Sequence, residues 1–134
     1  GKKIAILNFG ARLNETLKAS ESLKKKGINM TIVDARFAKP LDENLIWQLA
    51  TTHEAILTIE EGSIGGFGSH VINFLTKKGL MDSNLKFRSM TLPDIFIDQD
   101  TPDKMYKAAN LDSYSIEEKV LDVLNSNIVL QKQK

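Results

Sequence analysis

Three short apolar runs, separated by segments of helical period, constrain the fold of this chain more than any other feature. The runs cover residues 4–7, 30–33 and 55–59, and none of them alternates strictly between apolar and polar side chains. Strands covered on both faces of a parallel sheet have this continuous apolar pattern. We therefore expect a parallel sheet that is buried between two layers of helices.

Helical spacing is visible between the runs and after them. Apolar residues recur at this spacing at Leu13, Leu17, Leu23, Leu41, Leu45, Ile46 and Leu49. Gly27 is expected to end the first helix, and Asp42 to cap the second. A third helix should start near Phe67 and bury Val71, Phe74 and Leu75, with Gly79 near its end. A last helix should open at Ser115 and bury Val120, Val123 and Leu124.

The order of elements predicts the fold class. A fourth strand over residues 85–92 alternates between polar and apolar side chains, as expected at a sheet edge, and a short helix is expected to start at 101–103. Strands alternating with helices predict an α/β fold: a three-layer, doubly wound, mainly parallel sheet with helices on both faces. Residues 1–126 are expected to form a single domain and 127–134 a frayed tail. With the strand order 2-1-3-4, a crevice would open where residues 8–10 and 60–68 meet.

Composition excludes several classes of function. The chain has 134 residues, a formal net charge of +1 and no cysteine, which excludes disulfides and thiolate chemistry. Its basic residues are dispersed, so we expect no nucleic-acid partner. No apolar run approaches the ~20 residues that a membrane span needs, so we expect no membrane association, and the absence of cysteine suits a cytoplasmic location. Because the chain opens at Gly1 without an initiator methionine, we expect it to be a piece of a longer protein.

Residues 60–70 bring two carboxylates, four glycines and a histidine together after a strand. Neighbouring residues in a strand point to opposite faces, so Glu60 and Glu61 are not expected to form an acid–base pair. One of them is expected to face the start of the third helix or a partner domain. The glycine spacing is neither GxGxxG nor a P-loop, which leaves an anion site and a tight turn as alternatives.

The two histidines do not have metal-ligand spacing. His53 is expected at a helix end and His70 as a partly buried helix residue, so we predict no metal site. The segment 34–42 is more specific, because it places Arg36 in a proline-containing connection between a strand and a helix. Its guanidinium can pair with Asp34 or Asp42, or with a carboxylate of another domain.

An ordered series of motifs resembles the C-terminal domain of 1-deoxy-D-xylulose 5-phosphate synthase. The series is AILNFG at 5–10, DARFAKPLD at 34–42, His53, TIEEGSIGGFGS at 58–69, LPD at 92–94 and MYKAANLD at 105–112. The C-terminal domains of transketolases and of 2-oxo acid dehydrogenase beta subunits are looser relatives. The run at 36–42 favours the synthase over them.

The resemblance implies a parent enzyme that uses thiamine diphosphate and magnesium, both bound by preceding domains of the same chain. That transferase joins pyruvate and glyceraldehyde 3-phosphate, releases CO₂ and feeds isoprenoid, thiamine and pyridoxal synthesis. The domain itself would hold no cofactor or catalytic residue, would pack on the preceding domain and would support a homodimer. The alternative function is a small-molecule module that binds a nucleotide or a sugar phosphate. The residues expected at the crevice or interface are Asn8, Gly10, Asp34, Arg36, Phe37, Lys39, Pro40, Asp42, Glu60, Glu61, Gly65, Gly66 and Gly68.

Overall fold

A computed structural model describes residues 3–9, 13–35, 42–61, 66–92 and 112–125. Its elements are β1 (Lys3–Phe9), α1 (Leu13–Lys24), β2 (Asn29–Asp34), α2 (Glu43–Thr52), β3 (Ala55–Glu61), α3 (Phe67–Lys77), a 3-10 turn η2 (Leu80–Asp82) and β4 (Lys86–Leu92). A further helix covers residues 112–125. The helix expected to start at 101–103 and the tail expected at 127–134 lie outside the described residues.

The four strands form one parallel sheet with the order β2-β1-β3-β4. Ile6 of β1 lies beside Ile32 of β2 on one side and beside Leu57 of β3 on the other. The sheet therefore extends from the central pair β1 and β3 to β2 on one side and to β4 on the other. This arrangement confirms the predicted fold class and the predicted strand order.

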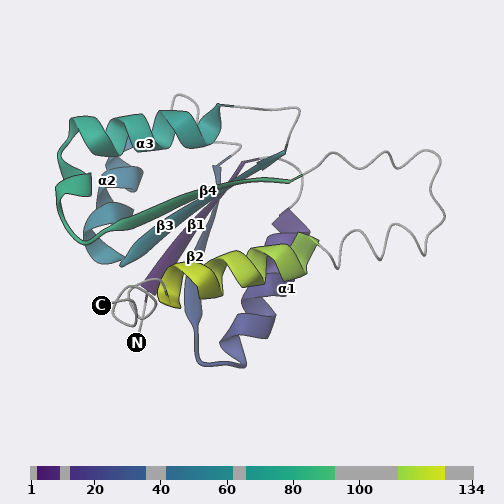
Figure 1. The fold of residues 1–134 in the computed structure, drawn as a ribbon. Helices are drawn as coiled ribbons and strands as arrows, with labels where there is room; N and C mark the ends of the chain where they lie inside the picture. The colour runs from purple at the N-terminus through teal and green to yellow at the C-terminus, as the bar shows by residue number, and fades with distance from the viewer. Residues whose placement is uncertain (1–2, 10–12, 36–41, 62–65, 93–111, 126–134) are drawn as a thin grey trace.

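Helices cover both faces of the sheet (Figure 1): α2 and α3 lie on one face, and α1 and helix 112–125 lie on the other. The strands contribute apolar side chains to the layers on both faces of the sheet, because alternate residues point to opposite faces. Ala5 and Leu7 pack with the α2 and α3 side chains Ile46 and Val71, among others. The second apolar layer contains Ile4, Ile6, Leu23, Leu57, Ile116 and Val120. The central strands β1 and β3 are thus buried on both faces, as their continuous apolar runs predict. The third run, at 30–33, belongs to the edge strand β2, whose residues are exposed or half-buried, so the prediction of a strand covered on both faces is wrong there.

Local signals set the ends of the helices. The Asp42 side chain caps α2 by accepting a hydrogen bond from the Leu45 N–H at 3.0 Å. Gly27 adopts a left-handed φ of +82° after α1, and its N–H donates to the Lys24 carbonyl. Both predictions are confirmed. Helix 112–125 starts before the predicted Ser115, but it buries Val120, Val123 and Leu124 as expected.

One burial prediction, that of a partly buried His70, is wrong, and one apolar residue at helical spacing, Leu17, does not face the sheet. Leu17 is 45% exposed although it lies on α1, because the face that packs on the sheet is formed by Thr16, Ala19 and Leu23. His70 is exposed on α3, next to the buried Val71. In both cases the helix is turned so that neighbouring residues, and not the predicted one, face the sheet.

Polar contacts attach helix 112–125 to the rest of the domain. One Glu117 carboxylate oxygen accepts hydrogen bonds from Ser22 Oγ at 2.9 Å and from Lys26 Nζ at 2.6 Å, both from the chain around α1. The Lys26 hydrogen bond is the main reason why the pKa of Glu117 lies below its usual value. Lys86 at the start of β4 donates to the Val123 carbonyl at 3.2 Å. Helix 112–125 is therefore held through its second turn, at Glu117, and through its last turn, at Val123.

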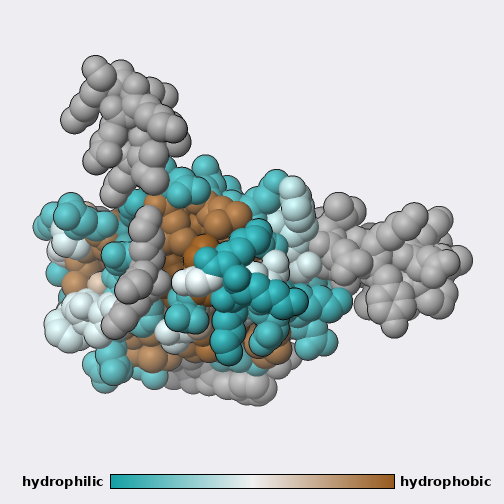
Figure 2. Space-filling view, turned by 90° about the horizontal axis from the view of Figure 1, so that it is seen from below, coloured by the Kyte–Doolittle hydropathy of each residue, from teal (hydrophilic) through white to brown (hydrophobic). Residues whose placement is uncertain are grey.

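The face that carries α1 and helix 112–125 also shows apolar side chains at its surface (Figure 2). Four apolar residues pack against this layer and are only partly buried: Ile28, Met30, Met90 and Leu121.

None of the helices in the described ranges has the length and apolar character that crossing a membrane requires.

Candidate functional site

The Glu60 carboxylate lies at the start of α3. Its Oε1 accepts a hydrogen bond from the Gly66 N–H at 3.2 Å, and its Oε2 accepts one from the Gly68 N–H at 3.0 Å. The side chain is only 6% exposed. Gly66, which precedes the helix, has no side chain that could cap it. Glu60 therefore performs this role from β3, with its charge at the positive end of the helix dipole.

This contact answers the question of the two adjacent carboxylates. The sequence predicts that one of them faces the start of the third helix or a partner domain, and the structure places Glu60 at the start of α3. The side chain of Glu61 and the residues 62–65 lie outside the described residues. Because both oxygens of Glu60 accept backbone hydrogen bonds, this carboxylate is a structural acceptor and is not poised as a general base. An incoming anion would have to displace it from the amides of Gly66 and Gly68.

Two glycines of this segment serve different purposes. Gly66 has a left-handed φ of +97° in open space, so it lets the backbone turn into α3. Gly68 lets the helix approach the sheet closely. A Cβ at Gly68 would overlap Ser89 Oγ of β4 and would lie 2.9 Å from Thr58 Oγ1 of β3. The Thr58 hydroxyl is fully buried and has no hydrogen-bond partner in the described structure. It therefore contributes to the contact with α3 through packing alone.

An aromatic pair joins the end of β1 to the same helix. Phe9 and Phe67 stack with their ring centroids 4.8 Å apart and an angle of 14° between the ring planes. Phe9 lies beside Glu60 in the register of β1 and β3. The carboxyl ends of these two strands therefore meet the first turn of α3, as the predicted crevice requires. Gly10 lies outside the described residues.

Asn8 lies on the other face of the sheet. Its Oδ1 accepts a hydrogen bond from Thr16 Oγ1 of α1 at 2.8 Å, and both side chains are fully buried. Asn8 follows Leu7 and precedes Phe9, so the pleat directs it away from Glu60. The ends of β1 and β3 thus lie side by side, but the side chains of Asn8 and Glu60 lie on opposite faces of the sheet. Thr16 was not among the predicted site residues. The one feature of the sequence that could have indicated it is its position, as a polar residue, on the buried face of a helix.

The remaining predicted residues are dispersed. Asp34 ends β2 beside Asn8 and is half-buried, and Asp42 caps α2. Arg36, Phe37, Lys39, Pro40 and Gly65 lie outside the described residues. The structure thus brings Glu60, Gly66 and Gly68 together and leaves the role of the 36–41 connection as a prediction.

The histidines have the roles of ordinary polar residues. His53 ends α2, with Nδ1 3.1 Å from the Leu49 carbonyl oxygen and Nε2 2.8 Å from Thr31 Oγ1 of β2. His70 is exposed on α3. Within the described ranges, no group of three or more histidine, aspartate or glutamate side chains could hold a metal ion.

Comparison with known proteins agrees with the fold. The family model of the transketolase C-terminal domain matches residues 1–116. A solved structure described as "Split gene transketolase, inactive beta4 tetramer" is similar with a TM-score of 0.70 and 27% sequence identity. The match covers 93% of this chain and 40% of that chain, so this chain spans less than half the length of its structural relative. The chain therefore belongs to the transketolase C-terminal domain family.

Proposed function

We propose that this chain is the C-terminal domain of a thiamine-diphosphate-dependent 1-deoxy-D-xylulose 5-phosphate synthase in the cytoplasm, and that it is a framework domain without catalytic activity of its own. The parent enzyme joins pyruvate and glyceraldehyde 3-phosphate to form 1-deoxy-D-xylulose 5-phosphate and CO₂. Membership of the transketolase family supports a transferase of this general type. The motif series from DARFAKPLD at 34–42 to LPD at 92–94 favours the synthase within that family.

The observation that carries the proposal is the position of Glu60. The most conspicuous motif of the chain, residues 60–68, contains two carboxylates and a glycine-rich loop, which an active site could use. In the structure its described carboxylate, at Glu60, is used to hold the backbone of Gly66 and Gly68. A carboxylate with both oxygens engaged in this way stabilises a turn, which fits a supporting domain.

The transketolase family generally uses thiamine diphosphate. The described residues do not fit this cofactor. Its diphosphate needs free amide or cationic donors, whereas the amides at the start of α3 already donate to Glu60. The same observation weighs against the alternative function, a module that binds nucleotides or sugar phosphates, because such ligands would use the same donors. We assign the cofactor and its magnesium to preceding domains of the parent chain.

Turnover measurements test the proposal. The chain alone and the full-length parent are assayed side by side with pyruvate, glyceraldehyde 3-phosphate, thiamine diphosphate and magnesium. We expect the product only from the parent. A parent that accepts only sugar-phosphate donors such as xylulose 5-phosphate would refute the synthase assignment, and turnover by the chain alone would refute the framework role.

The proposed partners are the preceding domain and a second copy of the parent. The 36–42 connection is the candidate contact, because it places an arginine and a proline where a simple loop needs neither. In the full-length protein, Arg36→Ala is expected to weaken dimerisation or reduce turnover. The matched control is Arg88→Ala, since the Arg88 guanidinium donates to its own chain at the Phe87 carbonyl, 2.8 Å away. An Arg36→Ala parent with unchanged dimerisation, stability and turnover would rule out this contact.

A further inference from the structure

β2 is an edge strand without the features that usually protect an edge. Among the described residues it pairs with β1 alone, so its outer side offers backbone N–H and C=O groups for pairing. Its sequence, NMTIVD, contains no lysine, arginine or proline, and its register with β1 runs from Asn29 to Asp34 without a bulge. Proteins use these features to keep further strands away from an edge. β2 is therefore open to the addition of a strand.

The edge on the other side of the sheet is different. β4 carries Lys86 and Arg88, and the Arg88 guanidinium donates to the Phe87 carbonyl of its own strand at 2.8 Å. Charged side chains along an edge make strand addition unfavourable, because the new strand would have to displace or desolvate them. The chain thus protects one edge of its sheet and leaves the other unprotected.

The side chains of β2 are more apolar than an edge requires. Met30, Ile32 and Val33 are only half-buried, and Asn29 and Thr31 are exposed. A continuous apolar run of this kind is typical of a strand in the interior of a parallel sheet, with neighbours on both sides. A further strand beside β2 would give it such a position and would bury more of its apolar surface.

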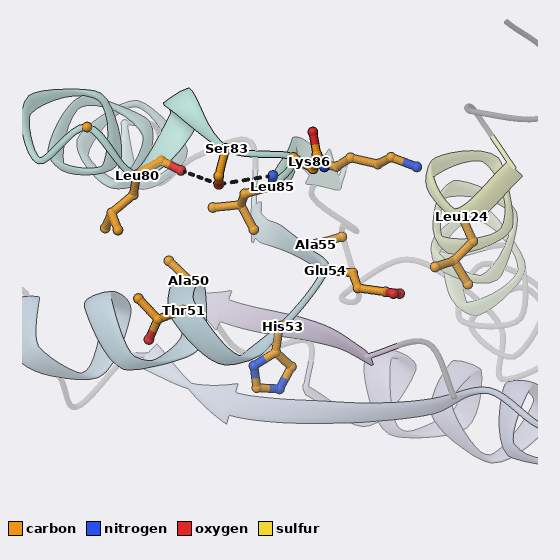
Figure 3. Close-up of a pocket in the computed structure, with 12 residues that line it drawn as sticks. Ala50, Thr51, His53, Glu54, Ala55, Leu80, Ser83, Leu85, Lys86 and Leu124 are labelled. Carbon is orange, nitrogen blue, oxygen red and sulfur yellow. Dashed lines mark hydrogen bonds between the residues drawn. The ribbon is translucent and has the colours of Figure 1, made fainter.

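Contacts on both faces of the sheet hold β2 in place. His53, one of the residues around the open cavity in Figure 3, lies at the end of α2 with its Nε2 2.8 Å from Thr31 Oγ1. On the other face, Met30 packs against the apolar layer that contains Leu23 of α1. The edge is therefore preorganised, and a second strand would bind it without first having to order it.

We propose that β2 pairs with β2 of a second copy of this chain, antiparallel and around a two-fold axis, so that the two sheets join into one. Directly opposite side chains of an antiparallel pair lie on the same face, so one residue of β2 must lie opposite itself. With Thr31 at the axis, Met30 lies opposite Ile32 of the second copy. The half-buried apolar side chains then cover each other, which makes β2 complementary to itself.

The charges around β2 favour the same register. The strand follows three lysines at 24–26 and ends at Asp34. Antiparallel pairing centred on Thr31 brings the acidic end of each strand close to the basic start of the other. A pair centred on Ile32 would instead place Asp34 opposite the apolar Met30 of the second copy. The pairing requires only this domain, so it does not rest on the identity of the parent enzyme.

The first test uses the absence of cysteine from the chain. Thr31→Cys places one thiol at the proposed axis, where the Cα atoms of opposite residues lie about 4.5–5.5 Å apart, within the range of a disulfide. Thr91→Cys is the matched control, because Thr91 is also exposed but lies on β4. Under mild oxidation, we expect Thr31→Cys to form the disulfide-linked dimer about tenfold faster than Thr91→Cys.

The second test is sedimentation equilibrium of the unmodified chain. We expect a dimer with a dissociation constant on the order of 10–100 µM, because a single pair of short strands forms a small interface. Thr31→Lys should raise this constant by about tenfold, since it places two ammonium groups opposite each other. Thr91→Lys makes the same change on β4 and should leave the constant unchanged.

Three results would overturn the proposal. These are a chain that stays monomeric up to about 1 mM, equal rates of disulfide formation in the two cysteine variants, and dimerisation that Thr31→Lys does not weaken. If circular dichroism shows that Thr31→Lys does not fold, the cysteine variants decide. Arg36→Ala concerns the full-length parent and its turnover, so the two proposals can fail separately.

Discussion

Replacing Glu60 by glutamine tests the structural role of its carboxylate most directly. The substitution keeps the size of the side chain and one carbonyl oxygen. The other oxygen becomes an NH₂ group, which cannot accept a hydrogen bond. Because Glu60 accepts from both Gly66 and Gly68 and is only 6% exposed, one of these amides loses its acceptor in a place that water does not easily reach.

The magnitude follows from two overlapping losses. A buried donor left without an acceptor costs about 1–3 kcal/mol. Removal of the negative charge from the start of α3 costs up to about 2 kcal/mol in a partly buried geometry. Because both losses concern the same hydrogen bonds, we expect Glu60→Gln to lower the free energy of unfolding by about 3 kcal/mol in total. At roughly 4 °C per kcal/mol for a domain of this size, Tm falls by about 12 °C.

Urea denaturation followed by circular dichroism measures this loss, with thermal melts as a second readout. Glu43→Gln is the matched control, because Glu43 also lies in the first turn of a helix but is exposed. It should cost less than about 1 kcal/mol. A Glu60→Gln variant within about 0.5 kcal/mol of the wild type would refute the reasoning, and so would an equal loss in the control.

Four other predictions concern single positions. Gly66→Ala should cost about 1–2 kcal/mol through backbone strain alone, since its φ is +97° and its surroundings are open; thermal melts measure this. Gly68→Ala should cost about 1–3 kcal/mol through overlap, and Ser89→Gly in the same chain should restore part of the loss in urea titrations. Asp42→Ala should cost about 1 kcal/mol and Asp42→Asn much less, because asparagine still caps α2. Glu117→Gln should lower the free energy of unfolding by less than about 1 kcal/mol at pH 7. Because the folded pKa of Glu117 lies below 4.5, its carboxylate stabilises the fold only while it is ionised, so the difference in Tm between wild type and variant should shrink as pH falls towards about 3.

Most of the fold can be predicted from the sequence because local and global signals agree. Continuous apolar runs indicate a sheet that is covered on both faces, and the buried strands β1 and β3 agree with this pattern. The run at 30–33 does not, because β2 lies at the edge of the sheet and is only half-buried. Gly27 and Asp42 mark helix ends through their own backbone and side-chain chemistry, so their prediction needs no tertiary information. Leu17 shows the limit: a leucine at helical spacing is exposed because the rotation of α1 is set by how Thr16, Ala19 and Leu23 pack.

The candidate site is only partly predictable. Alternation along a strand is enough to separate Glu60 from Glu61, and helix electrostatics is enough to place one carboxylate at the start of α3. The opposite placement of Asn8 requires the register of β1 against β3, which a single sequence does not contain. The close approach at Gly68 depends on Thr58 and Ser89 from two different strands, and neither residue carries a signal of its own.

The late position of helix 112–125 in the chain has a consequence for synthesis on the ribosome. Its side chains Ile116 and Val120 cover Ile4 and Leu57, so one face of the sheet lacks half of its cover until this helix has left the exit tunnel. A nascent chain that pauses before residue 112 would expose a broad apolar surface, and aggregation and chaperone binding would then compete with folding. Completion of the sheet's cover therefore depends on helix 112–125, whose attachment through Glu117 and Lys86 closes this face of the structure.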